Sequence, residues 1–531
     1  MRLRRVSGFK LAADHGLSAQ SKPRGKARQR SSPPVTSLNE AQYAELCAVC
    51  DALLLAPDAT IERIAMPWLH VLNEHPSNLA KYSGLVSPGR GITLHRLRSA
   101  ASQARRWLDT RKRGADADQL PSSADVIFVS HLLNESQIGA RQDFYFGRLP
   151  ELLLDDGISS CVLLINHIPT SRRLHAAWPS DMASRVILPD SLSLRGELSL
   201  RRRLGRDARR LRKASLQLEG GRRRIVNEAA RNATSGHSLA SLRMYQQIRD
   251  ITARLRPRAV VVTYEGHAWE RVAFAAARQS NHAVRCLGYH HTILFPRQHA
   301  ALRLLNDQLY DPDVILTAGE ISAARFHRSF GGAAVDVATM GIHRRESVAP
   351  STEAPESSDR SSRCLIIPDG VISEVIFLLD FAVEAARQAP DIRFVLRLHP
   401  VVSLEQLKTR FQRFQRLPAN VEFSTISLSA DFARSRWAVY RATNAAIYAV
   451  IAGLRPFYVE KPGEMSIDSL YELKGWKKVV RTPAEFVESA RSDAGPRSPF
   501  EAAEATVAAD YCKRYFVPPD YRVFVNALGR G

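Results

Sequence analysis

The sequence lacks the long apolar run that a membrane-spanning helix needs. No uninterrupted hydrophobic stretch in its 531 residues approaches the roughly 18–20 residues that cross a bilayer. The start, MRLRRVSGFKLAADHG, is positively charged but has no apolar centre, so it is not typical of a secretory signal. Its scarcity of acids leaves an organelle transit peptide as an alternative. We expect a cytoplasmic protein.

Cofactor motifs are also missing. No G-x-G-x-x-G or Walker sequence occurs, which counts against NAD and ATP as ligands. No Asp-x-Asp stands where a strand end would present it to a metal-bound nucleotide, because Asp116–Asp118 falls in a linker and Asp311–Asp313 precedes its strand. The sequence therefore predicts no required metal and no bound cofactor.

Cysteine is scarce, with six residues in the whole chain. Cys47 and Cys50 have no second pair at zinc-site spacing and lie in a helical pattern, AELCAVCDALLLA. We expect them to be neighbours on one helix face rather than metal ligands. Reduced thiols fit a cytoplasmic protein best.

Positive charge, in contrast, is abundant and concentrated. The formal net charge is +22. Residues 1–30 hold nine Lys/Arg against one acid, and residues 195–224 hold twelve against three, so together they carry 17 of the 22 net charges. The pattern indicates a nearly neutral, enzyme-like body with two basic appendages.

The texture of the sequence changes several times along the chain. The parts that we predict are a disordered basic tail (1–36), a helical extension (37–118), a first strand–helix domain (119–343) with a basic helical insertion (195–245), a polar linker (344–362), a second strand–helix domain (363–482) and a C-terminal helical segment (483–531).

Short apolar, β-branched runs alternate with helical patterns in both domains. The predicted strands lie at 125–130, 161–166, 185–189, 259–264, 284–289 and 313–318 in the first domain, and at 363–370, 392–400, 420–425, 437–442, 456–462 and 477–482 in the second. Continuous apolar strands separated by helices are typical of a parallel sheet covered on both faces. We predict the α/β class, with two doubly wound Rossmann-like domains facing each other across a cleft.

Polar groups follow four strands of the second domain. In chain order they are Asp369 and Gly370, then Arg397, His399 and Pro400, then Thr443 and Asn444, and finally Glu460. Ligands of open parallel sheets lie beyond the carboxyl ends of the strands, so this convergence predicts a binding site.

An anion would suit these groups. Thr443 and Asn444 begin a helix whose unpaired N–H groups favour negative charge, although a simple N-cap is the alternative. Arg397 and His399 are two residues apart, so we expect them to point to one side of the strand end and to donate to a leaving phosphate.

Histidines and carboxylates gather at strand ends of the first domain. The candidates are His131, Glu135, Glu265, His267, His290 and His291. Taking a proton from a hydroxyl requires a base, and Glu265, at the strand end itself, is our first choice. The alternative is that Glu265 pairs with Arg271 and stabilises the turn. We expect Glu270 to cap the following helix.

Several segments resemble a known family. LRLHP (396–400), preceded by PDG (368–370) and followed by RATNAAIYAVIAGLRPFYVE (441–460), resembles the carboxyl half of bacterial surface-carbohydrate glycosyltransferases of the GT-B type. It is more distantly similar to polysialyltransferases and to CDP-glycerol glycerophosphotransferases. Segments 129–157, 261–278 and 286–296 resemble parts of capsule and O-antigen transferases.

The sequence departs from these families at three motifs. It has Tyr289–His291 where a glutamine-histidine is commoner, Thr443–Asn444 where polysialyltransferases show a Ser/Thr pair, and Pro368 where polysialyltransferases carry a second acid. The last departure means that a base role is not carried over to Asp369.

The resemblance implies a glycosyltransferase of bacterial envelope polysaccharide synthesis. It implies a nucleotide-sugar as co-substrate and a polysaccharide or lipid-linked acceptor. We predict that the catalytic residues are Glu265, His267, His290 and His399, and that the donor site comprises Asp369, Gly370, Arg397, His399, Pro400, Thr443, Asn444 and Glu460. A CDP-linked glycerol- or sugar-phosphate transferase and a non-catalytic polysaccharide-binding scaffold are the alternatives.

The basic segments at 1–30 and 195–224 suggest a further partner. We expect them to dock on an anionic membrane surface, which would place the protein peripherally at the inner face of the cell membrane. A solvated insertion without a partner is the alternative. Aromatic residues are sparse there, which counts against nucleic-acid binding by base stacking.

Overall fold

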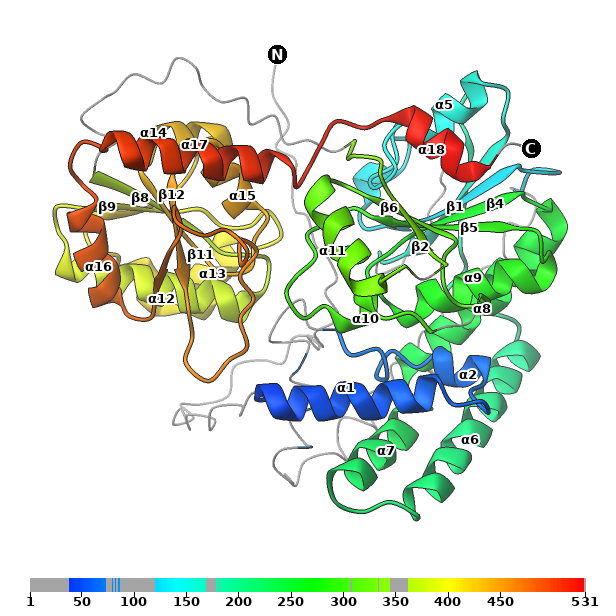
Figure 1. Cartoon of the computed structure of the whole chain (residues 1–531). Coiled ribbons are helices and arrows are strands. Elements are labelled where there is room, and N and C mark those ends of the chain that lie inside the picture. The colour runs from blue at the N-terminus through cyan, green and yellow to red at the C-terminus, as the bar shows by residue number, and fades with distance from the viewer. Residues whose placement is uncertain are drawn as a thin grey trace.

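The computed structural model describes residues 38–72, 79, 82, 85, 120–168, 178–179, 181–305, 308–332, 334–343 and 362–529. Outside these ranges lie the predicted tail at 1–36, nearly all of the predicted linker and much of the predicted helical extension. Two α/β domains lie side by side (Figure 1).

The first domain is built on a parallel sheet of seven strands. They are β1 (Val126–Leu132), β2 (Ser160–Asn166), β3 (Ser184–Ile187), β4 (Ala259–Thr263), β5 (Arg285–His290), β6 (Val314–Thr317) and β7 (Asp336–Thr339). Their order in the sheet is β3-β2-β1-β4-β5-β6-β7, and every neighbouring pair is parallel. The helices α5 (Leu149–Asp155), α9 (Ala268–Ser280), α10 (His299–Leu302) and α11 (Glu320–Phe330) and the 3₁₀ turn Glu135–Gln137 connect them.

The second domain repeats this plan with six strands. They are β8 (Arg363–Ile367), β9 (Arg393–Leu396), β10 (Val421–Phe423), β11 (Trp437–Tyr440), β12 (Arg455–Val459) and β13 (Lys478–Val480), in the order β10-β9-β8-β11-β12-β13. All pairs are again parallel. The intervening elements are α12 (Ile372–Gln388), α13 (Leu404–Arg410), the 3₁₀ turn Gln412–Gln415, α14 (Leu428–Arg434), α15 (Ala445–Ile451) and α16 (Pro483–Ser492).

The predicted fold class is confirmed by these two sheets. Both run outward from a central strand in the doubly wound manner, and their inner strands are buried on both faces, as continuous apolar runs require. Two predictions need correction. Strand β7 was not expected, and β9 ends at Leu396, so Arg397 and His399 follow the strand rather than belong to it.

Five helices extend the first domain. The helices α6 (Leu194–Ser215), α7 (Gly220–Asn232) and α8 (Gly236–Leu255) occupy the predicted basic insertion, and α1 (Glu40–Leu54) and α2 (Ile61–Ile64) pack against them. Arg63 of α2 pairs with Asp207 of α6 at 3.2 Å. Cys47 and Cys50 are buried on α1, and all six cysteines are free and buried, so the prediction that Cys47 and Cys50 are neighbours on one helix face is confirmed.

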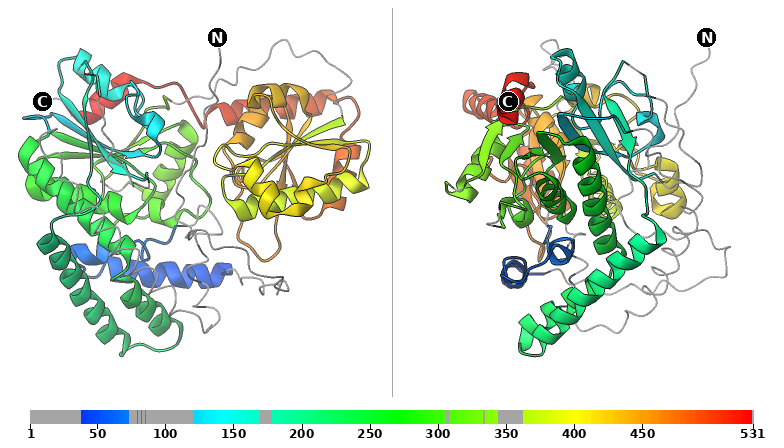
Figure 2. Two further views of the ribbon diagram at one scale, coloured as in Figure 1. Left: turned by 180° about the vertical axis from the view of Figure 1, so that it is seen from behind. Right: turned by 90° about the vertical axis from the view of Figure 1, so that its right-hand side faces the viewer.

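The C-terminal segment returns to the first domain. Helix α17 (Pro499–Lys513) packs on the second sheet, an extended stretch follows, and α18 (Tyr521–Leu528) packs against the first sheet (Figure 2). Phe524 of α18 stacks on Phe128 of β1 with ring centroids 5.8 Å apart. Among the described helices, none has the length and apolar composition to cross a membrane.

Candidate active site

The reversal of strand order marks one position on each sheet. The order changes direction between β1 and β4 in the first sheet and between β8 and β11 in the second. Ligands of doubly wound sheets bind beyond the carboxyl ends of the strands at such a point. The segments that follow these four strands are therefore the candidates.

The turn after β4 is held by a buried carboxylate. Glu270, in the first turn of α9, accepts hydrogen bonds at 2.8–3.0 Å from the main-chain N–H groups of Glu265, Gly266 and His267. Burial raises the pKa of Glu270, whereas the three donors favour its carboxylate form. The predicted capping role is confirmed, and it fixes the position of Glu265 and His267.

Glu265 lies between two imidazoles. One carboxylate oxygen is 3.3 Å from Nε2 of His267, and the other is 3.5 Å from Nε2 of His291. Burial alone would raise the pKa of Glu265, but the hydrogen bond from His267 and the charges of both histidines lower it to about 2. Glu265 is therefore ionised at neutral pH. Its side chain is 26% exposed and that of His267 is 33% exposed, so both can meet a substrate.

His290 lies below this site. Its ring is fully buried, Nδ1 is 2.8 Å from the carbonyl oxygen of Tyr264, and its plane meets Phe326 edge-on. Burial lowers the pKa of His290 to about 4, so the ring is neutral. The catalytic role predicted for His290 is therefore corrected. Its neighbour His291 reaches Glu265, because side chains of consecutive residues in an extended chain point to opposite sides.

A second imidazole pair stands beside the first. Nδ1 of His131, near the end of β1, is 2.9 Å from Nε2 of His167, and Nε2 of His131 is 3.2 Å from the hydroxyl of Thr263. Burial lowers the pKa of His131 to about 3, so His131 is neutral. The ring of Tyr145 contacts both groups, with centroids 5.4 Å from His131 and 4.5 Å from His291.

Sequence reasoning named His131 but missed His167 and Tyr145. His167 directly follows β2 and so shares the strand-end signal that identified the other residues. Tyr145 follows no strand, and no sequence pattern singles it out.

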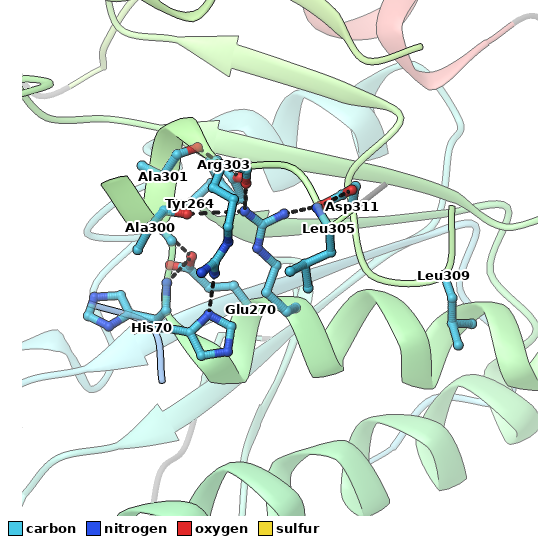
Figure 3. Close-up of polar contacts among 12 residues, drawn as sticks. His70, Tyr264, Glu270, Ala300, Ala301, Arg303, Leu305, Leu309 and Asp311 are labelled. Carbon is cyan, nitrogen blue, oxygen red and sulfur yellow. Dashed lines mark hydrogen bonds and ion pairs between the residues drawn. The ribbon is translucent and has the colours of Figure 1, made fainter. Parts of the chain in front are cut away.

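Two buried arginines, Arg271 and Arg303, lie in a network of polar contacts next to the Glu265 turn (Figure 3). Arg271, on α9, pairs with Asp311 and donates to the carbonyl oxygens of Ala300 and Arg303 at 3.2 and 2.6 Å. The alternative in which Arg271 pairs with Glu265 is therefore wrong. The carboxylate of Glu265 remains directed at the histidines.

The N-terminal extension contacts the segment next to the Glu265 turn. Asp51 of α1 contacts Nε2 of His299 at 2.6 Å and accepts a hydrogen bond from Arg303 at 2.7 Å, and Arg303 also donates to Nδ1 of His70 at 3.0 Å. Helix α10, which these contacts hold, packs so closely that a Cβ on Gly266 would overlap its main chain. The extension thus fixes the element on which the Glu265 turn rests.

In the second domain, Gly370 and His399 come together. A Cβ on Gly370 would lie only 3.2 Å from Nδ1 of His399, and the main-chain N–H of Val401 donates to that nitrogen at 3.4 Å. This contact leaves the ring hydrogen on Nε2, where it can donate to a phosphate. Asp369 accepts from the N–H of Val371 at 2.9 Å and so shapes the turn. Pro400 is exposed beside them.

Arg397 turns away from this group. Its guanidinium donates to Asp431 and to the carbonyl oxygen of Ile426, both at 2.7 Å, and to the hydroxyl of Ser424 at 3.2 Å. Asp431 is 2% exposed. We predicted that Arg397 and His399 point to the same side, but in the structure they point to different sides. Arg397 connects β9 with the segment after β10.

Thr443 and Asn444 precede α15 at the switch point. The Thr443 hydroxyl accepts from the N–H of Ala445 at 3.3 Å, and Asn444 is exposed with no side-chain cap hydrogen bond. Behind them Arg441 is 1% exposed and pairs with Glu374 and Glu464 at 2.6 and 2.9 Å.

Glu460 lies at the margin of the site. It pairs with Arg481 at 2.6 Å on the surface. Among the described residues, no three metal-ligating side chains come together. Two surface hollows of the described structure lie away from these strand ends and are lined by residues such as His282, Arg285 and Val335.

Comparisons with known proteins give limited information. No family model and no curated protein matches the chain. Solved structures similar to it include the glycotransferase of kitacinnamycin, with 13% identity, TM-score 0.43 and coverage of 77% of this chain and 100% of that one. Acinetobacter baumannii MurG shows 12%, 0.43, 76% and 99%, and the UDP-GlcNAc 2-epimerase of Methanocaldococcus jannaschii shows 11%, 0.39, 73% and 99%. With sequence identities and TM-scores this low, the description of the fold rests on the two sheets themselves.

Proposed function

We propose that the chain is a GT-B-type glycosyltransferase that moves a sugar from a nucleotide-sugar to a surface-polysaccharide or lipid-linked acceptor. The observation that carries the proposal is the presence of a histidine-bound carboxylate at the switch point of the first sheet and of polar, anion-compatible turns at that of the second.

The second domain would hold the donor diphosphate. Nε2 of His399, which packs beside Gly370, can donate to a phosphate, and Thr443 and Asn444 lie at the neighbouring strand end. These donors would stabilise the charge that develops on the leaving nucleotide. Arg397, paired with Asp431, is not included among them.

The first domain would activate the acceptor hydroxyl. In the reaction the hydroxyl oxygen bonds to the anomeric carbon while the bond from that carbon to the diphosphate oxygen breaks, and the nucleotide leaves with the electron pair. The hydroxyl proton passes to His267, and the ionised Glu265 beside it stabilises the imidazolium. His291 holds the second oxygen of Glu265 in place.

Three finer features belong to the same proposal. The sequence offers no Asp-x-Asp at a strand end, which supports a metal-independent reaction. The capsule- and O-antigen-like segments support an envelope acceptor. The basic helices α6 and α7 support a position at the inner face of the membrane.

A donor-binding assay tests the proposal. We expect at least one nucleotide among UDP, CDP, GDP and CMP to raise the melting temperature, and the matching nucleotide-sugar to be slowly hydrolysed. His399→Ala should abolish both effects, whereas His282→Ala, at an exposed histidine outside the site, should not. If no nucleotide shifts the melting temperature, the proposal fails and the scaffold alternative gains. Turnover of CDP-glycerol alone would favour the phosphotransferase alternative.

A further inference from the structure

Helix α6 has two faces of opposite character. Leu200, Leu204, Ala208, Leu211 and Ser215 are buried against the extension and α8. At about 100° per residue, the opposite arc carries basic side chains, all exposed: Arg195, Arg202, Arg206, Arg209 and Lys213. The inner face is fully used in packing, so the basic arc is the outer surface of the molecule at this place.

The positive charge of this arc is not neutralised by its own helix. The two acids of α6, Glu197 and Asp207, are both buried and face inward. Glu197 pairs with Arg243 at 2.6 Å, and Asp207 pairs with Arg63 at 3.2 Å. The acids therefore hold the helix in the fold and leave the outer charges available to a partner.

Leucines border the same arc. Leu194, Leu198 and Leu216 are 48%, 44% and 70% exposed. On an α-helix these three positions fall within about 40° of one another, beside the basic arc. Exposed large apolar side chains next to cations are the composition of a helix that lies in a lipid–water interface.

Helix α7 extends the charged surface. Arg222, Arg223 and Arg224 are exposed at its start, while Ile225 and Val226 are buried. Figures 1 and 2 show α6 and α7 at the periphery of the first domain, separated from the second domain by α1. A flat partner could reach both helices without touching the strand ends of the candidate site.

We propose that the outer face of α6, together with Arg222–Arg224 of α7, binds the anionic surface of a lipid bilayer. The cations would contact lipid headgroups, and the bordering leucines would enter the boundary between headgroups and acyl chains. This interaction does not depend on the proposed sugar transfer, since it uses none of the residues of that site.

Lipid fits this face better than nucleic acid does. Residues 194–232 contain no aromatic side chain on which a base could stack. A phosphate backbone offers exposed leucines no apolar contact, whereas a bilayer surface accommodates both leucine and arginine. Counterion-dependent binding to nucleic acid would also be expected to vanish at high salt, where the leucines would retain the protein on lipid.

Co-sedimentation of the full chain with vesicles tests this proposal. We expect binding to vesicles of phosphatidylcholine with phosphatidylglycerol and little binding to phosphatidylcholine alone. A basic residue near anionic lipid strengthens binding roughly fivefold, so the variant R202Q/R206Q/R209Q/K213Q should bind at least about tenfold more weakly. L198S/L216S should lose most of the binding that persists at high salt.

A matched variant separates surface position from net charge. R393Q/R416Q/R434Q/K478Q removes the same four charges from exposed positions of the second domain and should bind within about twofold of the parent. The proposal is overturned if both sets weaken binding equally, if anionic vesicles are not bound, or if single-stranded RNA or duplex DNA binds more tightly than the vesicles. Nucleotide-induced stabilisation should survive in all these variants, so failure of lipid binding is distinct from failure of donor binding.

Discussion

At the scale of single residues, the proposed sugar transfer depends on the charge of Glu265. We expect Glu265→Gln to lower sugar transfer by about 10²-fold or more, because a neutral amide cannot stabilise a protonated His267. Steady-state rates with the nucleotide-sugar found in the binding assay would measure this. Donor binding should be unchanged, so a loss of nucleotide affinity in the variant would contradict the assignment of Glu265 to the acceptor side.

The same residue should leave a signature in stability against pH. The pKa of Glu265 is lowered from 4.5 to about 2 in the fold, so its carboxylate stabilises the folded state above about pH 4.5. That contribution disappears as the pH falls toward 2. The difference in the free energy of unfolding between parent and Glu265→Gln, by denaturant titration, should therefore shrink over this range. A constant difference would mean that Glu265 is not held in its ionised form.

Arg397 should behave as a structural residue. Arg397→Ala leaves the buried Asp431 without its cationic partner, with the hydroxyl of Ser424 still donating to it at 2.6 Å. It should cost about 2–3 kcal/mol, somewhat less than a fully buried pair because Arg397 is 27% exposed. Adding Asp431→Asn should recover part of this loss in denaturant titrations. Nucleotide binding should survive Arg397→Ala and be lost in His399→Ala. The reverse result would restore Arg397 to the donor site.

Single residues also show what could and could not be predicted from the sequence. Sequence reasoning located the Glu265 turn and the cap at Glu270, because a strand end and a helix start are visible as patterns. It named His290 rather than His291 as catalytic, since the two differ only in the side of the chain to which they point, and His291 is the one that reaches Glu265. The partner of Arg397 lies 34 residues away and depends on the neighbouring strand.

At the scale of elements, strands were predictable where burial makes them apolar. Runs such as the one in β4 are buried at every position and show it in their composition. The edge strand β7, Asp336–Thr339, is exposed or half-buried throughout, so its sequence carries no such mark. The polar contacts of Asp51 and His70 with His299 and Arg303 were equally invisible, because they join segments more than 200 residues apart.

The docking of this N-terminal extension should be sensitive to pH through His70. Burial and the charges of Arg303 and Arg271 hold the pKa of His70 well below 6.5, and the carbonyl of Ile64 accepts a hydrogen bond from its Nε2 at 2.8 Å. His70 is thus neutral in the fold but takes up a proton on unfolding below pH 6.5. The fold therefore loses stability as the pH falls, by up to about 1.4 kcal/mol per pH unit from this residue.

His70→Gln provides the comparison. Glutamine can still donate to Ile64 and accept from Arg303 but does not titrate. Between pH 6.5 and 5 we expect the free energy of unfolding of the parent to fall more steeply than that of the variant. The difference in slope should correspond to about one additional proton taken up on unfolding. Equal slopes in denaturant titrations at several pH values would show that His70 is protonated in the folded state.

At the scale of the whole molecule, the two domains are joined by more than a linker. Arg325 of α11 is 4% exposed and donates to Glu472 and to the hydroxyl of Tyr515, both at 2.9 Å, in the second domain and its C-terminal segment. Main-chain hydrogen bonds continue the contact, from Val517 to Ala318 and from Ile342 to Val517, each at 3.0 Å. Because the proposed sugar transfer needs groups from both sheets, we expect the crossing segment to affect it.

Two glycines allow this crossing segment to be tested without touching the site. Gly341 and Gly332 have nearly the same φ, +88° and +89°, so alanine at either position is held in the unfavourable left-handed region. A Cβ on Gly341 would overlap the carbonyl of Pro518, whereas one on Gly332 meets nothing within 4 Å. We expect Gly332→Ala to cost about 1–2 kcal/mol. Gly341→Ala should cost clearly more. We expect the parent to melt in one calorimetric transition and this variant to melt in two, as the C-terminal segment leaves the first domain. Identical melting curves for the two variants would mean that the segment does not couple the domains.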